Sequence, residues 1–246
     1  MKQENYIRGM IMIILSAFFF ACMNVSVRLA GDLSSVQKSF FRNLVAAFFA
    51  AIILIKNHTA PKVEKTQWGS LFLRCAFGTL GILCNFYAID HLLVADASIL
   101  NKLSPFFAII FSFLLLKEKI KPAQAMCVIL AFVGCLFVVK PGFENAHLIP
   151  ALIGVCGGLG AGIAYTMVRK MGTHGVKGPV IVFYFSCFSC IIVIPWIVFH
   201  YQPMSLRQLL TLLLAGLFAA GGQFTITAAY TYAPAVSYTH LRAHET

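Results

Sequence analysis

The sequence predicts an all-α polytopic membrane protein, and three observations support this fold class. First, 60% of the 246 residues are hydrophobic and only 11% are charged, which is too little charge to cover a soluble domain of this length. Second, apolar runs of about 20 residues recur along the chain, and a helix of that length spans the hydrocarbon of a bilayer. Third, the connections between these runs are short, so no separate soluble domain fits between them.

Eight apolar runs are predicted to be transmembrane helices. In order, they are Gly9–Val27, Lys38–Ile55, Trp68–Ile89, Ala95–Leu116, Pro122–Val139, Leu148–Val168, Pro179–Phe199 and Leu206–Tyr230. The first run follows Lys2 and Arg8, as the core of a signal peptide would. Because further membrane segments follow it, we expect this first span to be retained.

The basic residues are distributed unevenly between the two sides of this predicted topology. With a cytoplasmic N-terminus, eleven lysines and arginines lie on the inner side and five, namely Arg28, Lys38, Arg42, Lys140 and Arg207, lie on the outer side. Cytoplasmic loops of membrane proteins are enriched in Lys and Arg. The net charge of +11 therefore indicates a multi-pass protein of the cytoplasmic (inner) membrane, N-terminus inside, rather than a nucleic-acid-binding protein.

The eight cysteines all lie inside the apolar runs, where cysteine behaves as a small hydrophobic residue. Cys187 and Cys190 have the spacing of a redox motif, but they lie mid-span with no histidine ligand. We therefore expect no metal site, no redox site and no cofactor.

The last residues, "VSYTHLRAHET" (236–246), break the apolar pattern abruptly. They resemble one reading frame of the transposase adapter used in sequencing libraries, translated as if it were part of the gene. We therefore exclude them from functional reasoning, and we expect the native chain to continue beyond about residue 235 with further membrane helices.

Two parts of the chain resemble each other at a nearly constant offset. "NVSVRLAG" (24–31) matches "YTMVRKMG" (165–172) at an offset of 141, and Gly81 matches Gly221 at an offset of 140. Units of five spans each would enter the membrane from opposite sides, so the pattern predicts inverted five-helix repeats. We place the first repeat at 1–142 and the second, cut short after its third helix, at 148–235.

Several motifs then resemble the drug/metabolite transporter superfamily, specifically two EamA-type half-domains. They are "FFRN" (40–43), "NFYAIDHLLVADASI" (85–99), "LSP" (103–105), "KEK" (117–119), "VGCLFVVKPG" (133–142), "AYTMVRKMG" (164–172) and "GGQFTITAAYTYAPA" (221–235). The resemblance covers essentially all of residues 7–235. It implies a ten-helix carrier with both termini inside, of which eight of ten transmembrane helices are present here.

Polar side chains recur at helical spacing on several of the spans, together with small residues. They include Asn24, Asn85, Asn101, Lys102, Tyr165, Gln223 and Thr227. Polar groups in lipid usually face protein or a water-filled cavity, so these residues are predicted to bind the substrate. The alternative left open for each of them is a hydrogen bond that only joins neighbouring helices.

The fourth span carries features that are unusual for a membrane helix. Pro105 has no amide hydrogen and crowds the carbonyl of Asn101, so we expect the helix to loosen there, as suits a gating helix. Lys102 can either reach the membrane surface or contact an acidic or zwitterionic substrate. For Arg74, near the inner end of the third span, we expect the side chain to extend to the membrane surface.

These features together predict a secondary transporter, not an enzyme. It would move a small metabolite, such as an amino acid, a related metabolite or an amphipathic drug, across the bilayer by alternating access. Export is favoured by the habit of the resembled family alone, and whether the protein forms a homodimer stays open. The alternatives are a channel or facilitator and, less favoured, an intramembrane lipid-modifying enzyme built on the spacing of His91 and Asp96.

Overall fold

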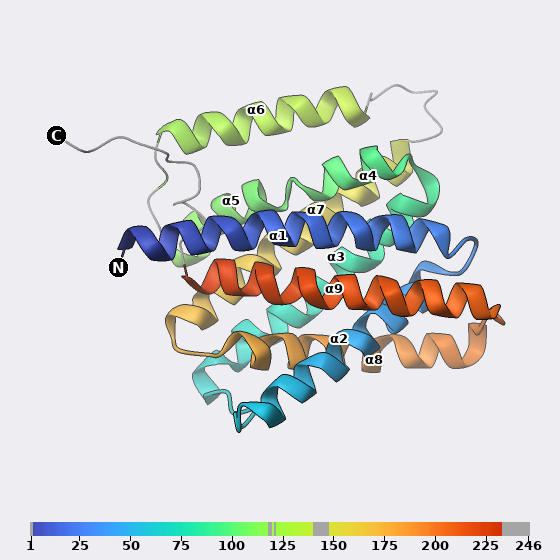
Figure 1. Ribbon diagram of the computed structural model, residues 1–246. Coiled ribbons are helices and arrows are strands. Elements are labelled where there is room, and N and C mark those ends of the chain that lie inside the picture. Colours follow the sequence, from blue (N-terminus) through green and yellow to red (C-terminus); the bar gives the residue numbers. More distant parts are fainter. Residues whose placement is uncertain (1, 118–119, 121, 140–147, 233–246) are drawn as a thin grey trace.

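The computed structural model describes residues 2–117, 120, 122–139 and 148–232, and every regular element in these ranges is helical (Figure 1). The elements are α1 (Lys2–Leu29), α2 (Ser35–Lys56), the 3-10 turn η1 (Lys65–Gln67), α3 (Trp68–His91), α4 (Val94–Asn101), α5 (Ser104–Leu116), α6 (Pro122–Val139), α7 (Leu148–Thr173), α8 (Gly178–His200) and α9 (Leu206–Tyr232). Residues 236–246, which we assigned to an adapter, lie outside the described residues.

Seven helical segments are long and apolar enough to cross a membrane. They are Ile7–Leu29, Ser35–Lys56, Lys65–His91, Val94–Leu116, Leu148–Thr173, Gly178–His200 and Leu206–Tyr230. The remaining predicted run forms α6, in which the apolar stretch within the described residues, Ala125–Cys135, is shorter. The prediction of an all-helical, multi-pass membrane protein is therefore confirmed.

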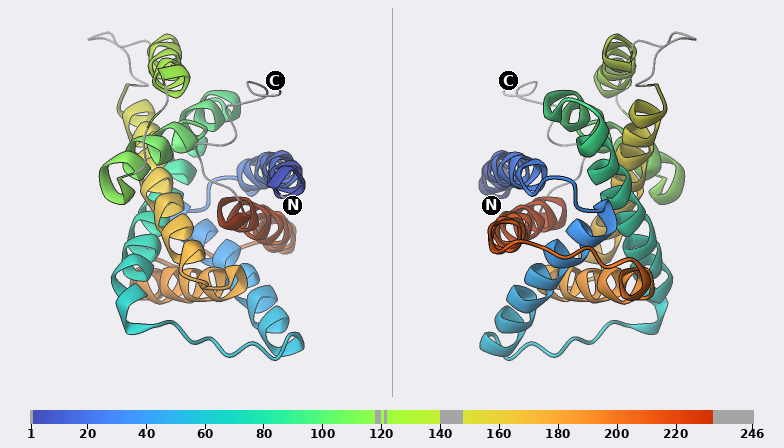
Figure 2. Two further views of the ribbon diagram at one scale, coloured as in Figure 1. Left: turned by 90° about the vertical axis from the view of Figure 1, so that its left-hand side faces the viewer. Right: turned by 90° about the vertical axis from the view of Figure 1, so that its right-hand side faces the viewer.

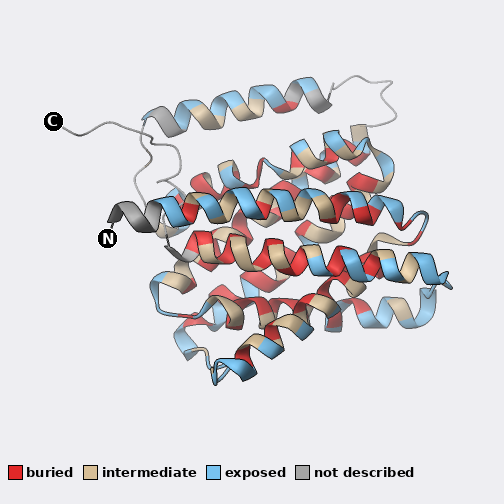
Figure 3. Ribbon diagram, viewed as in Figure 1, coloured by how far each residue is buried: buried red, intermediate tan, exposed pale blue. Residues whose placement is uncertain are grey.

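The exterior of the helix bundle is apolar, and much of its interior is polar. Large hydrophobic side chains such as Phe18, Phe48 and Phe72 are exposed, whereas Asn43 and Ser189 are completely buried. Exposed and buried positions alternate along the helices of the bundle (Figure 3). An apolar surface of this extent is characteristic of contact with lipid. Buried polar groups need partners, and they supply the hydrogen bonds described below.

Helices that are far apart in the sequence pack side by side. The closest associations are those of α1 with α9, α3 with α7, and α2 with α8. In the end-on views of Figure 2, α1 and α9 lie next to each other, and α3 and α7 lie together on the other side of the bundle. Helix α6 lies at the edge of the bundle (Figure 1).

Glycines allow α3 and α7 to approach each other closely. A Cβ atom at Gly157 of α7 would lie 3.2 Å from the carbonyl oxygen of Gly81, and one at Gly160 would lie 2.8 Å from the carbonyl oxygen of Phe77. Small residues at such positions let the backbones of membrane helices meet. This close contact fixes α3, which carries several cavity residues, against α7.

The loops gather at two opposite ends of the bundle (Figure 1). At the first, which we call the Gln202 end, the amide of Ser34 donates to Oε1 of Gln202 at 2.7 Å and joins the α1–α2 and α8–α9 loops. At the other, the Thr59 end, Nζ of Lys177 donates to Oγ1 of Thr59 at 3.3 Å and joins the loops after α2 and α7. The connections on the two sides of α2, and those on the two sides of α8, therefore lie at opposite ends, as expected for consecutive membrane spans.

The predicted fourth span is interrupted, as the proline led us to expect. Helix α4 ends at Asn101 and α5 begins at Ser104, with Pro105 in its first turn. Proline cannot donate to the carbonyl four residues earlier, which here is that of Asn101. Lys102 and Leu103 therefore separate two helices where the sequence alone predicted one span.

Candidate functional site

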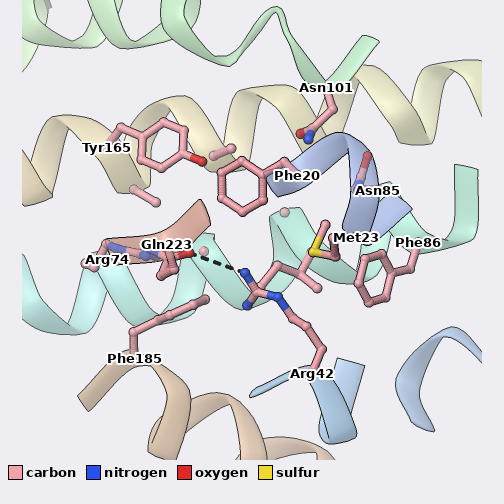
Figure 4. A pocket seen from close by; sticks show the side chains of 15 residues that line it. Phe20, Met23, Arg42, Arg74, Asn85, Phe86, Asn101, Tyr165, Phe185 and Gln223 are labelled. Carbon is pink, nitrogen blue, oxygen red and sulfur yellow. Dashed lines mark hydrogen bonds between the residues drawn. The ribbon is translucent and has the colours of Figure 1, made fainter. Parts of the chain in front are cut away.

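A cavity lies inside the bundle and is lined by seven helices (Figure 4). The lining residues are Phe20 and Met23 of α1, Arg42 of α2, Arg74, Gly78, Gly81, Ile82, Asn85 and Phe86 of α3, Asn101 of α4, Ala161, Ala164 and Tyr165 of α7, Phe185 of α8, and Gln223 of α9. The space open to the centre of a water molecule is about 50 Å³. Pockets for drug-sized ligands usually measure about 300–1,000 Å³. In this conformation the cavity therefore admits a small polar group but not a whole metabolite.

Arg42 enters the cavity from α2, and two neutral amides orient its guanidinium. Its Nη1 donates to Oδ1 of Asn43 at 2.6 Å, and its Nη2 donates to Oε1 of Gln223 on α9 at 3.3 Å (Figure 4). Asn43 is held in turn by its Nδ2, which donates to Oγ of Ser189 on α8 at 2.8 Å. These bonds connect α2, α8 and α9 around one positive charge.

Arg74 enters from α3, with its side chain only 2% exposed. Its guanidinium carbon lies 3.9 Å from the centroid of the Phe185 ring, which is the geometry of a cation–π contact. Gly78, one turn further along α3, makes room for this arrangement. A Cβ atom at Gly78 would overlap Nη1 of Arg74 and would lie 2.8 Å from Cε2 of Phe185.

The two arginines place two positive charges in one buried cavity. The guanidinium carbon of Arg42 lies 5.8 Å from the centroid of the same Phe185 ring, so the charges are near each other and repel. No acidic side chain belongs to the lining among the residues that the structure describes. The cavity is therefore electropositive.

Several polar atoms of the cavity residues have no hydrogen-bond partner in the described part of the chain. They are Nε of Arg42, Nε of Arg74, Oδ1 of Asn85 and Nε2 of Gln223. Buried polar atoms without partners are rare in folded proteins, and each one points to a bound water molecule or a ligand. Three of these four atoms are nitrogen donors, which favours a ligand rich in acceptor oxygens.

Four of the predicted substrate-binding residues lie on the cavity wall. Asn85, Asn101, Tyr165 and Gln223 come from four different helices and line the same space (Figure 4). The ring of Tyr165 is stacked on that of Tyr230, with centroids 5.0 Å apart, which holds it in place between α7 and α9. Their contact with a substrate stays a prediction.

The other predicted site residues lie outside the lining. Asn24 is buried and its Nδ2 donates to Oγ of Ser98 at 3.1 Å, so it joins α1 to α4. Thr227 is buried, with its methyl carbon near Gly178 at the start of α8. Lys102 and Pro105 are exposed at the break between α4 and α5. The roles predicted for these four residues are untested.

The sequence reasoning missed both arginines. The prediction that Arg74 extends to the membrane surface is wrong, because its side chain is buried against Phe185. Arg42, which we counted among the outer basic residues, is also buried within the bundle. One signal could have revealed Arg74: it lies four residues before Gly78 and eleven before Asn85, on the same helical face that was already identified as polar.

A second polar cluster closes the Gln202 end of the bundle. Lys38 of α2 is buried and forms an ion pair with Asp90 at the end of α3, and Ser35 donates to the other oxygen of that carboxylate at 2.9 Å. Arg28 of α1 donates to the carbonyl oxygens of Ile89 and Asp90. Lys38, counted as an outer residue from the sequence, thus lies inside the bundle and ties α2 to α3.

The histidine considered for catalysis has a local role. Nδ1 of His91 lies 2.8 Å from the carbonyl oxygen of Tyr87, and the two rings are stacked with centroids 4.0 Å apart. His91 is exposed at the end of α3, and Asp96 lies in the first turn of α4. The ring is therefore held by the backbone of its own helix, one turn earlier, and by the Tyr87 ring.

Comparisons with known proteins identify relatives of this chain. The family described as the EamA-like transporter family matches residues 7–140. A pseudopaline exporter of Pseudomonas aeruginosa is 32% identical over 229 residues, which cover 91% of this chain and 78% of that protein. Human solute carrier family 35 member G1 is 27% identical, with 90% of this chain and 64% of that protein covered. A solved structure described only as a crystal structure of a protein matches with a TM-score of 0.68 at 14% identity, covering 93% of this chain and 79% of its own, and shows the same fold.

Proposed function

Because this chain belongs to the EamA-like transporter family, we propose that it is a secondary transporter that carries a small metabolite across the cytoplasmic membrane by alternating access. The names of its relatives point to transporters rather than enzymes. The Pseudomonas relative is named an exporter, which supports outward transport. An amino acid, a related metabolite or an amphipathic drug is the proposed substrate.

One observation carries this proposal: the buried polar cavity between helices from both parts of the chain. It is lined by α1 to α4 from the first part and by α7 to α9 from the second, and Arg42 and Gln223 are hydrogen-bonded across it. In transporters built from repeats, the substrate site commonly lies at the interface between the repeats. The space in this conformation is smaller than a whole metabolite needs, so binding would require the helices to move apart, as alternating access supposes.

The helix pairing supports inverted repeats at 1–142 and 148–235. If α1 corresponds to α7 and α3 to α9, a two-fold axis turns the pair α1–α9 into the pair α7–α3. Both pairs are present and are the most extensive associations in the bundle. The third pair, α2 with α8, would then lie on the axis, and its two helices carry Arg42 and Phe185 to the cavity.

Alternating access requires contacts that form in one state and break in another. We assign this role at the Gln202 end to the ion pair of Lys38 with Asp90, which joins α2 to α3. The break between α4 and α5 at Pro105 supports a second moving element, because a helix interrupted there bends at little cost. We propose that these elements gate the cavity on the two sides of the membrane.

Transport by purified protein in proteoliposomes tests this proposal against a channel. A mixture of radiolabelled amino acids serves as the probe, offered to vesicles preloaded with the same unlabelled mixture and to empty vesicles. A carrier gives saturable uptake that preloading stimulates. Uptake that rises linearly with concentration and ignores preloading would indicate a channel, and vesicles without protein provide the background.

A further inference from the structure

Building on the proposed transport function, we infer that the cavity is a carboxylate site, in which Arg42 and Arg74 together bind the anionic group of the transported solute. The inference rests on the charge of the cavity, on the donors that face it and on the apolar wall beside them. The ligand class is a small organic carboxylate with an apolar body.

The positive charge of Arg42 and Arg74 favours an anionic ligand in the cavity. Arg42 and Arg74 are each 2% exposed and lie within a membrane-spanning bundle, where an uncompensated charge is costly. Among the described acidic residues, Asp90 is paired with Lys38, Asp32 and Glu64 are exposed, and none lines the cavity. The described lining holds no carboxylate that could pair with these two buried cations. They are therefore suited to binding an anion that enters the cavity.

The two guanidinium groups are held in place, but some of their N–H groups have no hydrogen-bond partner among the described residues. Two amide oxygens hold the Nη atoms of Arg42, and the Phe185 ring supports the guanidinium of Arg74 (Figure 4). The Nε atom of each arginine has no partner among the described residues. A planar guanidinium whose N–H groups are available binds a planar carboxylate through two parallel hydrogen bonds.

The remainder of the wall indicates what the carboxylate is attached to. Next to the arginines the lining consists largely of Phe20, Met23, Ile82 and Phe86, and these side chains face the cavity from α1 and α3. A highly charged ligand such as inorganic phosphate would leave this wall without a favourable contact. A carboxylate with an aromatic or aliphatic body would contact both the arginines and this apolar wall once the cavity widens beyond its present size.

Thermal unfolding of the purified full chain, followed with a thiol-reactive dye, tests the inference. Three carboxylates and their uncharged amides serve as probes: benzoate with benzamide, 3-phenylpropionate with 3-phenylpropanamide, and succinate with succinamide. We expect at least one carboxylate to raise the Tm, and its amide to leave the Tm unchanged. In Arg42→Gln and Arg74→Gln, the concentration for half of the shift should rise about tenfold or more, as for a lost charge-assisted hydrogen bond.

Arg207→Gln is the matched control, because Arg207 is exposed at the start of α9 and its loss removes the same charge far from the cavity. Arg74→Lys keeps the charge but not the planar fork, and it should weaken binding even if Arg74→Gln does not fold. The inference is overturned if no carboxylate shifts the Tm more than its amide, if inorganic phosphate alone does so, or if the cavity variants respond like Arg207→Gln.

The outcomes also separate the site from the transport function. Saturable flux of an uncharged or cationic solute that Arg74→Gln leaves intact would keep the transporter and overturn the carboxylate site. Carboxylate binding that needs both arginines, without flux of the bound carboxylate in proteoliposomes, would keep the site and overturn the transporter.

Discussion

The central guanidinium carbon of Arg74 lies 3.9 Å from the centroid of the Phe185 ring on α8. This contact joins a residue from the first part of the chain to a residue from the second, at the wall of the cavity. It places a positive charge in the middle of a membrane-spanning bundle on an aromatic support rather than on a carboxylate.

Replacing Phe185 with Leu should remove the support of Arg74 while the residue stays apolar. A desolvated cation–π contact is worth about 2 kcal/mol, so we expect transport of the cognate solute to fall by about tenfold or more. The control is Phe188→Leu, because Phe188 stacks edge-to-face on Phe72 and lies outside the lining. Equal initial rates for the two variants in proteoliposomes would show that Phe185 only fills space.

Replacing Gly78 with Ala should displace the Arg74 guanidinium. The added methyl group would overlap Nη1 of Arg74 and press on Phe185, and overpacking of this kind costs about 1–3 kcal/mol. We expect loss of transport together with a lower Tm. At Gly69 nothing lies within 4 Å of an added Cβ, so Gly69→Ala should keep transport and gain roughly 0.5–1 kcal/mol of helix stability. Transport by Gly78→Ala at the rate of Gly69→Ala would contradict the arrangement.

Replacing Asp90 with Asn should destabilise the Gln202 end of the bundle. Lys38 is buried, and its partner carboxylate is 19% exposed, so we expect a loss of about 2–3 kcal/mol, somewhat below the cost of breaking a fully buried pair. Thermal unfolding measures this as a lower Tm. Adding Lys38→Met to Asp90→Asn should recover most of the loss, because the unpaired ammonium is removed as well. A double variant that is no more stable than Asp90→Asn would mean that the pair itself matters little.

Replacing Gly160 with Ala should push α7 away from α3. A Cβ atom at this position would lie 2.8 Å from the carbonyl oxygen of Phe77 and 3.3 Å from the amide nitrogen of Gly81, both of which belong to the backbone and cannot turn aside. We expect a Tm decrease that corresponds to about 1–3 kcal/mol. Gly134→Ala in α6 is the control, since an added Cβ there has open space. Similar melting of both variants would argue against close packing of α3 and α7.

Replacing Asn24 with Ala distinguishes a bridge between helices from a substrate contact. Its amide donates to Oγ of Ser98 at 3.1 Å, and such bonds between membrane helices are worth about 0.6 kcal/mol on average. We expect Asn24→Ala and Ser98→Ala to lower the Tm slightly and equally, with no further effect when they are combined, and to leave transport intact. Transport lost in Asn24→Ala but kept in Ser98→Ala would instead support the substrate contact that was predicted from the sequence.

The sequence by itself determined the class of fold, the position of most spans and the break at Pro105. These properties are local: a run of apolar residues is long enough to cross the hydrocarbon or it is not, and proline removes a hydrogen bond wherever it occurs. The same is true of the polar faces on the third, sixth and eighth predicted spans, which the spacing of Asn85, Tyr165 and Gln223 revealed.

Only the tertiary structure decided which of the polar residues meet in the cavity. A long cationic side chain near the end of a span can reach the membrane surface or turn into the bundle, and the choice depends on the neighbouring helices. The Arg74 side chain turns into the bundle because Gly78 has no side chain and leaves room for the guanidinium. The guanidinium also meets the ring of Phe185, which is more than 100 residues away in the sequence. For Asn24 the choice was decided by Ser98 on α4, which engages its amide outside the cavity lining. Such long-range contacts follow from helix packing, which the periodicity of a single segment does not specify.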